Sequence, residues 1–381
     1  MFRRYGLHPC LLALASFLAY SIPIVATAEQ NDRLNAQSPL LFRWTEFTAD
    51  GKREERSIYT AQITSCPIGT SERLSPQWGT GDFKIRVCSQ TLETNLLSID
   101  RIVVIGDTGC RFPAGQNCDR VDVDWPLKKI ASLAAGRKPD LVIHVGDYLY
   151  RECPNGELLC GDPNEGNRWN AWQLDFFQQV RDLLVVAPWI FVRGNHERCG
   201  RQSEGWARLI SPVPENSLDC VETAAPYLLE FRDINFVIVD SSAAGNANPL
   251  KGQTKLRDIL TRVERNPVWL LTHKPLHMLN EWLPNNTKVD LVLSGHVHGF
   301  ITYSLGPVMQ LVVGNGGTNL DLDLPGFDAE TNGTSTTTVG KHGYFLIERQ
   351  IDRWLGTLYG TDDKVLETCV IQSSKTQCNT N

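Results

Sequence analysis

The sequence predicts an α/β protein, and two observations along its 381 residues support that fold class. From Ile99 onward, short apolar segments typical of strands alternate with amphipathic segments typical of helices. The apolar segments have no polar face, which is typical of strands that are covered on both sides. An α/β sandwich is therefore the natural architecture. The expected strands are 101–106, 141–146, 189–193, 235–240, 268–272 and 291–294, and the expected helices lie near 125–135, 169–184, 204–210 and 254–263.

Residues 29–98 differ from the rest and are predicted to form a small, mostly β N-terminal module. Segments with β-type composition, such as 57–63 and 83–87, are separated there by clusters of glycine, proline and serine. The α/β pattern then occupies residues 99–381 as the main domain. A polar stretch within it, 332–338, is expected to be a surface loop.

The first residues predict a secretory signal peptide over 1–28. An arginine pair precedes an apolar run over 11–25, and small residues at 26–28 provide a cleavage site. A retained membrane anchor is the alternative. Because the run is interrupted by Pro23 and is shorter than the ~20 residues that span a bilayer, cleavage is favoured. We therefore expect a secreted or periplasmic protein without stable membrane insertion.

The cysteines agree with export. Cys10 lies in the expected signal peptide, and an even set of ten remains, which in an exported chain predicts disulfides. A structural zinc site is the alternative, but spacings of seven residues or more lack its short Cys-Cys spacing. The sequence leaves the connectivity open. Pairing of each cysteine with its near neighbour would give Cys66–Cys88, Cys110–Cys118, Cys153–Cys160, Cys199–Cys220 and Cys369–Cys378.

The charge balance of the chain bears on whether nucleic acid could be a partner. The formal net charge is −6, from 37 Lys and Arg against 43 Asp and Glu. An acidic chain gains no long-range attraction to a polyanion, so this balance argues against a nucleic-acid partner.

Polar residues follow five of the expected strands directly at their C-terminal ends. Loops converge beyond the carboxyl ends of strands in α/β proteins, which makes this edge the usual ligand site. The mixed oxygen and imidazole donors suit iron, zinc or manganese better than calcium. Seven donors oversupply one ion but suit two ions that share a carboxylate. The seven are Asp107, Asp147, Tyr150, Asn195, His273, His296 and His298.

These polar residues form five blocks in a distinctive order. The blocks are Asp107-Thr108-Gly109, Gly146 to Tyr150, Gly194 to Glu197, Leu270 to His273 and Gly295 to His298. They resemble the D-x-G, G-D-x-x-Y, G-N-H-[DE], V-x-x-H and G-H-x-H blocks of the calcineurin-like metallophosphoesterase superfamily, and more narrowly of the purple acid phosphatases. Leu270 stands where the fourth block has valine. The resemblance implies the αββα fold, a two-sheet β-sandwich flanked by helices.

The resemblance also implies two metal sites that share Asp147. Most of the superfamily resembles D-x-H in its first block, where this sequence has Gly109. A phenol loses its proton at neutral pH only to a strong Lewis acid, so a Tyr150 ligand favours Fe³⁺, with Zn²⁺, Mn²⁺ or Fe²⁺ at the other site. The alternative is that Tyr150 only packs. One ligand set would be Asp107, Asp147, Tyr150 and His298, and the other Asp147, Asn195, His273 and His296.

The implied function is that of a secreted, acid phosphatase-like hydrolase of phosphate monoesters, which acts by attack of a metal-bound hydroxide. By resemblance His196 faces the substrate, as a transition-state or leaving-group residue. A catalytic role is also predicted for Asp147 and for His277, although the spacing of His277 leaves a structural role equally open. His144 is expected to be a buried supporting residue. Two alternatives stay open: a phosphodiesterase acting on nucleotides or lipid headgroups, and a non-catalytic extracellular binding protein.

Overall fold

The computed structural model describes residues 39–79, 83–93, 97–150, 168–213, 218–244, 252–263, 266–279, 288–305, 308–321, 335–372 and 376–379. All of them belong to one unit, Pro39–Asn381. The expected signal peptide over 1–28 and the expected Cys153–Cys160 pair lie outside the described residues.

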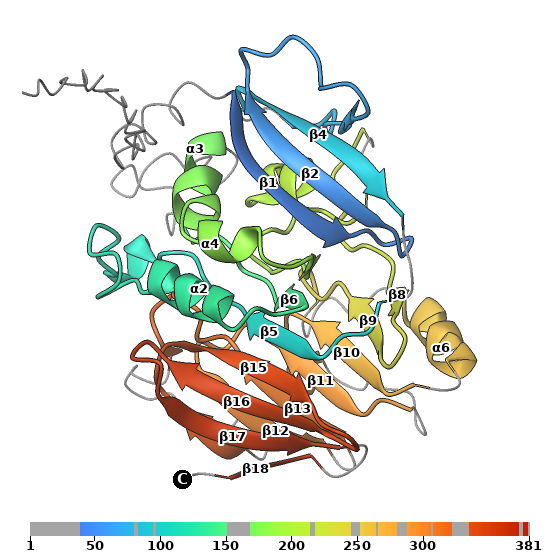
Figure 1. The fold of residues 1–381 in the computed structure, drawn as a ribbon, viewed down its shortest axis with the longest axis vertical. Helices are drawn as coiled ribbons and strands as arrows, with labels where there is room; N and C mark the ends of the chain where they lie inside the picture. The colour runs from blue at the N-terminus through green and yellow to red at the C-terminus, as the bar shows by residue number, and fades with distance from the viewer. Residues whose placement is uncertain are drawn as a thin grey trace, which may run out of the picture. The chain divides into compact units, whose positions relative to one another are not determined.

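The described residues form two sheets, of which the larger has eleven strands in the order β18-β17-β16-β15-β5-β6-β7-β1-β2-β4-β3 (Figure 1). Strands β5, β6, β7 and β1 are parallel neighbours, and antiparallel strands extend the sheet on both sides. The strands are β1 (Leu40–Phe47), β2 (Arg53–Thr60), β3 (Ser71–Glu72), β4 (Ile85–Leu92), β5 (Arg101–Ile105), β6 (Leu141–His144), β7 (Trp189–Phe191), β15 (Gly343–Arg349), β16 (Trp354–Gly360), β17 (Val365–Ile371) and β18 (Gln377–Asn379).

The second sheet has seven strands in the order β14-β12-β13-β11-β10-β9-β8. Its centre is parallel, from β9 through β10 and β11 to β13, and antiparallel strands close both edges. The strands are β8 (Tyr227–Glu230), β9 (Asn235–Val239), β10 (Val268–Thr272), β11 (Leu291–Ser294), β12 (Phe300–Leu305), β13 (Val308–Val313) and β14 (Ser335–Val339).

The two sheets pack against each other through one hydrophobic core. Ile102 and Val104 of β5 share this core with Leu291 and Leu293 of β11. Side chains alternate along a strand, so Val103 and Ile105 of β5 face the opposite side of the sheet, where they are also fully buried. Burial on both faces explains why these strands are uniformly apolar in the sequence.

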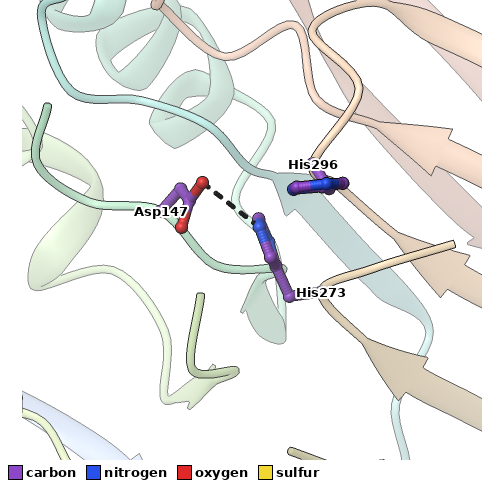
Figure 2. Close-up of side chains that lie close together, drawn as sticks. All are labelled: Asp147, His273 and His296. Atoms are coloured by element: carbon purple, nitrogen blue, oxygen red, sulfur yellow. Dashed lines mark ion pairs between the residues drawn. The ribbon is translucent and has the colours of Figure 1, made fainter. Parts of the chain in front are cut away.

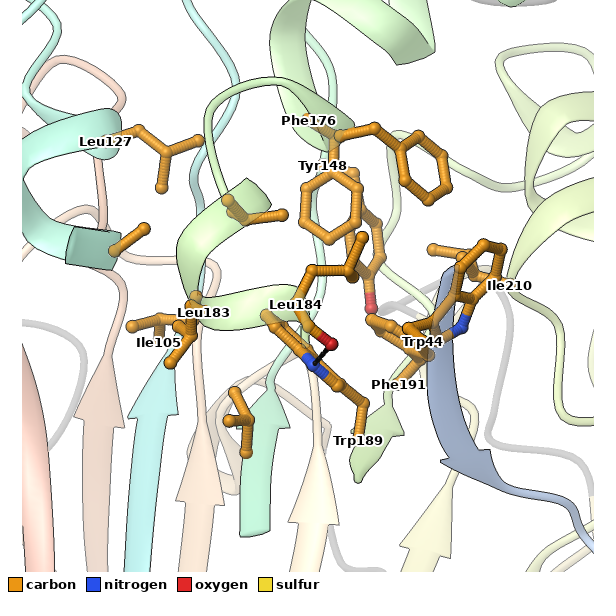
Figure 3. Close-up of a cluster of buried hydrophobic side chains, with 14 of the residues drawn as sticks. Trp44, Ile105, Leu127, Tyr148, Phe176, Leu183, Leu184, Trp189, Phe191 and Ile210 are labelled. Carbon is orange, nitrogen blue, oxygen red and sulfur yellow. Dashed lines mark hydrogen bonds between the residues drawn. The ribbon is translucent and has the colours of Figure 1, made fainter. Parts of the chain in front are cut away.

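Helices cover the outer faces. On the larger sheet, α2 (Leu127–Gly136) and the segments α3 (Trp169–Trp172), η5 (Gln173–Phe177) and α4 (Arg181–Leu184) pack on an aromatic-rich core, part of which is drawn in Figure 3. On the second sheet, α6 (Gln253–Arg262) buries Leu256 and Leu260. The layers are therefore helix, sheet, sheet and helix, which confirms the predicted αββα fold class. The remaining elements are η1 (Phe112–Ala114), α5 (Ser203–Leu209) and η6 (Leu276–Leu279).

Two predicted elements differ from the structure. The helix expected near 169–184 is interrupted by the π-helical η5, whose wider turn allows consecutive Phe176 and Phe177 both to be buried. The surface loop expected over 332–338 is wrong for the described part, because Ser335–Val339 forms β14 and pairs with β12. That segment is rich in threonine, a β-branched residue that favours strands.

The N-terminal strands continue the larger sheet. β1 pairs in parallel with β7 through Glu46 and Trp189, and β2 and β4 follow on its far side. Arg56 of β2 is fully buried and donates hydrogen bonds to the carbonyl oxygens of Leu209 and Ser211, at 2.9 Å each, at the end of α5. The β segments of the expected N-terminal module therefore share one hydrogen-bonded sheet with β5–β7.

Four disulfides lie among the described residues and confirm the corresponding predicted pairs. They are Cys66–Cys88, Cys110–Cys118, Cys199–Cys220 and Cys369–Cys378. In the same part of the chain, no helix has both the length and the apolar character that a membrane span requires.

Candidate active site

The seven expected ligands lie in loops at the C-terminal ends of parallel strands. Asp107 follows β5, the loop with Asp147 and Tyr150 follows β6, and Asn195 lies beyond β7. On the other sheet His273 follows β10, and the loop after β11 carries His296 and His298. The structure brings all seven together, as the following contacts describe.

Tyr150 is the centre of one group of contacts. Its phenol oxygen lies 2.9 Å from Oδ1 of Asp107, 3.1 Å from Oδ2 of Asp147 and 3.0 Å from Nε2 of His298. A phenol has a single proton, so it cannot donate to every one of these neighbours. The side chain is buried among charged and polar atoms rather than packed only against apolar ones.

His273 is the centre of the other group. Its Nε2 atom lies 3.0 Å from Oδ1 of Asn195 and 3.2 Å from Oδ2 of Asp147. The rings of His273 and His296 lie 5.1 Å apart between centroids. Figure 2 shows these two imidazoles and the Asp147 carboxylate turned toward one another, and one ligand atom from each lies within 4.8 Å of the others.

The backbone at three of these residues is in the left-handed region. Asp107, Asp147 and His296 have φ angles of 54°, 59° and 74°, and they are three of the six non-glycine residues with positive φ among the described positions. Such a conformation costs on the order of 1–3 kcal/mol and persists only where the surroundings enforce it. The carboxyl groups of two of these residues accept hydrogen bonds from neighbouring loops, Oδ2 of Asp107 from His296 N–H and Oδ1 of Asp147 from His196 N–H.

Two glycines permit the close approach of the loops. A Cβ atom at Gly194 would overlap Oδ1 of Asp147, and one at Gly295 would overlap Oδ2 of Asp107. Gly194, after β7, therefore leaves room for the carboxylate in the loop after β6, and Gly295, after β11, leaves room for the carboxylate in the loop after β5.

Glu197 organises the same turns, a role that the sequence did not reveal. This fully buried carboxylate accepts hydrogen bonds from the backbone N–H groups of Asp147 at 3.2 Å, Tyr148 at 2.9 Å and Gly194 at 3.1 Å. It thus links the loop after β6 to the loop after β7. The acidic position that closes the third sequence block is the signal from which this role could have been suspected.

The electrostatics of the two carboxylates differ. Burial and the nearby charge of Asp147 hold the pKa of Asp107 well above its usual range. Burial acts in the same direction on Asp147, but the imidazoles of His273 and His196 outweigh it and hold the pKa of Asp147 well below its usual range. Burial and the Asp107 carboxylate raise the pKa of the Tyr150 phenol. Without a cation, this buried cluster therefore favours the charged form of Asp147 and the neutral forms of Asp107 and Tyr150.

The two histidines for which catalysis is predicted occupy different surroundings. The His196 ring packs against the Tyr150 ring at an interplanar angle of 49°, with 4.1 Å between the ring centroids, and its Nε2 atom lies 3.9 Å from Oδ2 of Asp147. His277 lies in η6 against the ring of Tyr303, at 4.3 Å, and neither of its ring nitrogens has a hydrogen-bond partner in the described part of the chain. Burial lowers the pKa of His277 to about 4.

His144 and Arg201 support the site from outside the seven. His144 is fully buried, as expected, and its Nε2 atom lies 2.9 Å from the hydroxyl of Thr108 while its Nδ1 accepts from Gly146 N–H. Arg201, which the sequence did not single out, lies beside His196 with its Nη2 atom 3.0 Å from Nδ1. Arg201 has no motif signal, because its position depends on the turn that follows Asn195.

Comparison with known families identifies the arrangement. The calcineurin-like phosphoesterase family model matches residues 100–300, just over half of the chain, and that range contains all seven expected ligands. The chain belongs to this family. The predicted family is thereby confirmed. The calcineurin-like phosphoesterase fold implies two metal ions.

Individual relatives are distant from this calcineurin-like phosphoesterase. It is 29% identical over 185 residues to phosphoenolpyruvate phosphatase of Allium cepa, a match over 43% of this chain and 36% of the relative, so it spans about a third of that protein's length. Purple acid phosphatase from yellow lupin (Lupinus luteus) seeds has a similar structure, with a TM-score of 0.54 and 14% identity over 90% of this chain and 74% of that one.

Two further structures share the fold. PhoD has a TM-score of 0.55 at 12% identity, covering 91% of this chain and 93% of its own. GAP50, described as the anchor in the inner membrane complex of Plasmodium, has a TM-score of 0.51 at 13% identity, covering 72% and 89%. At such low identity these likenesses concern the fold alone.

Proposed function

We propose that this calcineurin-like phosphoesterase is a secreted phosphomonoesterase with a dinuclear metal site built from the seven residues described above. The observation that carries the proposal is the position of one atom. Oδ2 of Asp147 lies 3.1 Å from the phenol oxygen of Tyr150 and 3.2 Å from Nε2 of His273, the centres of the two groups of contacts. A single carboxylate between two donor sets suits a bridging ligand.

The donor atoms fit two cations of different character. Asp107, Tyr150 and His298 would hold Fe³⁺ with Asp147, and Asn195, His273 and His296 would hold Zn²⁺, Mn²⁺ or Fe²⁺ with the same carboxylate. The burial of two neighbouring carboxyl groups, which raises the pKa of Asp107, together with the left-handed backbone at Asp107 and Asp147, supports a site that cations would stabilise. When bound, the metal ions supply Lewis-acid activation of water and neutralise phosphate charge.

The protein's own residues would position the substrate and protonate its leaving group. His196 lies at the edge of the cluster, where its ring can donate a hydrogen bond or a proton to the leaving-group oxygen of the ester. The bond from His196 N–H to Asp147 fixes the ring relative to the proposed bridge. Glu197 accepts hydrogen bonds from backbone amides of the loops after β6 and β7, and so holds the Asp147 carboxylate and the His196 imidazole in fixed positions relative to each other.

Three observations bear on substrate and location. The onion relative is named as a phosphatase of phosphoenolpyruvate, a monoester, and this supports monoesters as the substrate class. The Plasmodium protein with a similar fold is described as an anchor, which bears on the binding-protein alternative, but all seven donor residues of the proposed metal site are present in this chain. The four disulfides support export, since disulfides persist in oxidising compartments.

The test compares hydrolysis of an aryl phosphomonoester and an aryl phosphodiester by the oxidised wild type and by Asp147→Asn, with metal content measured for both. Asparagine tolerates the left-handed backbone at this position, so the substitution removes charge without adding strain. Asp122→Asn is the matched control, because Asp122 is exposed and has a φ of 73°.

We expect wild type and Asp122→Asn to hydrolyse the monoester, and Asp147→Asn to lose activity and both metals. Preference for the diester would replace the monoesterase by the phosphodiesterase alternative. A wild type that binds two metals but hydrolyses neither ester would favour the binding protein, and two metals retained in Asp147→Asn would contradict the bridge.

A further inference from the structure

Arg201 lies in a short, braced turn between Asn195 and α5. Its backbone N–H donates to the carbonyl of Arg198 at 3.1 Å, and Gln202 N–H donates to the carbonyl of His196 at 3.1 Å. The Cys199–Cys220 disulfide ties the same turn to a separate segment. A side chain on so constrained a turn has a defined position before any ligand arrives.

The guanidinium of Arg201 lies against the loop that carries Asn195 and His196. Its Nη1 donates to the carbonyl of Asn195 at 3.1 Å, and its Nη2 lies 3.0 Å from Nδ1 and 3.3 Å from Nε2 of His196. The group is only partly buried, so a ligand that reaches His196 from solvent can also reach it. Arginine carries five N–H donors in one plane and can hold the loop and a ligand together.

Arg201 places a cation beside His196 in a chain whose formal net charge is −6. Arginine binds phosphate oxygens in a fixed, often bidentate geometry and keeps its charge at every physiological pH.

We propose that Arg201 binds a non-bridging oxygen of the substrate phosphate beside His196 and thereby makes the site selective for monoesters over diesters. The assignment rests on the proposed function. A monoester phosphate offers three non-bridging oxygens and up to two negative charges, whereas a diester offers two oxygens and one charge. A guanidinium next to the proposed metal-bound face therefore gains more from the monoester.

The experiment uses the full, oxidised, metal-loaded protein and the variants Arg201→Gln and Arg201→Lys. Arg120→Gln is the control, because Arg120 is exposed and its ion pair is with Asp124 at 3.1 Å. Three quantities are measured for each: bound metal, kcat/KM for an aryl phosphomonoester and an aryl phosphodiester, and the dissociation constant of inorganic phosphate by calorimetry.

We expect Arg201→Gln to keep both metals, to lower kcat/KM for the monoester by about 10²–10³-fold, and to lower it for the diester by at most about tenfold. Arg201→Lys should restore part of the monoester rate, and Arg120→Gln should differ from wild type by less than about threefold. The dissociation constant of phosphate should rise in Arg201→Gln in parallel with the loss of monoester activity.

Equal losses for the two esters, or loss of metal, would show that Arg201 only holds the Asn195 loop and would overturn the assignment. The calorimetric measurement separates this failure from that of the proposed function. If the wild type hydrolyses neither ester but binds phosphate in an Arg201-dependent way, the proposed function is wrong, the selectivity falls with it, and the assignment of Arg201 to phosphate binding stands. If phosphate binding is the same with and without Arg201, the assignment fails whatever the activity.

Discussion

The phenol oxygen of Tyr150 lies 3.1 Å from Oδ2 of Asp147, three residues earlier in the same loop. The left-handed backbone of Asp147, with φ 59°, turns this loop back on itself and so allows the contact. Asp107 approaches the same phenol from a neighbouring strand end, at 2.9 Å. The two carboxyl groups oppose loss of the phenol proton, and a cation shared by the three side chains would favour that loss.

Replacement of Tyr150 by phenylalanine tests whether this phenol is a metal ligand. Coordination to Fe³⁺ removes the phenol proton and produces a visible charge-transfer absorption, so Tyr150→Phe should lose the colour of the iron-loaded protein. Tyr148→Phe is the matched control, because Tyr148 is also buried but donates to the carbonyl of Val192 at 3.0 Å. The measurement is the absorption spectrum at equal iron content. An unchanged spectrum for Tyr150→Phe would exclude the ligand.

Replacement of Glu197 by glutamine should change the affinity of the site for metal rather than the colour of the protein. The three backbone donors of Glu197 all point N–H groups at the carboxylate, so Glu197→Gln places an amide group against at least one of them. We expect metal affinity to fall by about 10–100-fold, the usual scale for residues that orient ligands. Competition with a chelator measures it, and exposed Glu230→Gln should behave as wild type. Wild-type affinity in Glu197→Gln would show that the turns hold without it.

The sequence predicted the position of the site because chemistry and topology coincide there. Each expected ligand directly follows an apolar segment that proved to be a strand, and parallel strands bring such loops to one edge. Glu197 and Arg201 were missed as functional residues because their contacts arise from the turn after β7. A turn of this kind has no periodicity from which side-chain direction can be read.

The fold was predicted less completely toward the C-terminus. The antiparallel strands β15 to β17 were not predicted. β17 alternates between buried and more exposed positions, which is a weaker signal than uniform burial, whereas β15 is buried but its short apolar run, 344–347, has no periodicity that tells a strand from a buried helix. The N-terminal β segments were predicted, but their pairing with β7 was not. That pairing joins Glu46 to Trp189, residues far apart in the chain, and local composition carries no information on it.

The ring of His277 predicts a pH dependence of stability. Burial lowers its pKa to about 4, whereas the unfolded chain has a histidine pKa near 6.5. Between these values the unfolded chain binds a proton that the folded chain does not, so the free energy of unfolding falls as the pH is lowered through this window. His277→Gln removes the effect and should gain stability relative to wild type near about pH 4.5 but not near about pH 7.5.

Urea unfolding of the oxidised protein at both pH values measures this difference. Tyr303→Phe is the control, because burial raises the pKa of Tyr303 to about 12, far outside the window. A constant difference between His277→Gln and wild type at the two pH values would mean that the folded ring titrates normally. The same result would reopen a role for His277 as a proton donor at mildly acidic pH, since a neutral ring above about pH 4 cannot be the acid.

Replacement of Arg56 tests whether the N-terminal strands unfold together with the rest of the protein. Arg56 is fully buried, lies 2.8 Å from Oε1 of Glu46, and donates to the carbonyls of Leu209 and Ser211. Arg56→Met takes the guanidinium away from the carboxyl groups of Glu46 and Glu54 and from the Leu209 carbonyl, although the Ser211 carbonyl keeps its hydrogen bond from Arg73. We expect a loss of about 3–5 kcal/mol in the free energy of unfolding. Denaturant unfolding of the oxidised protein measures it.

Arg43→Met is the comparison for Arg56→Met, because Arg43 lies on neighbouring β1 with about half of its side chain exposed and an ion pair with Glu55 at 3.8 Å. We expect it to change stability by no more than about 0.5 kcal/mol. Similar small losses in both variants would mean that the N-terminal strands contribute little to the stability of the catalytic unit. A large loss in Arg56→Met alone, with α5 and the Asn195 turn losing protection from hydrogen exchange, would show that these strands brace the loop that carries His196.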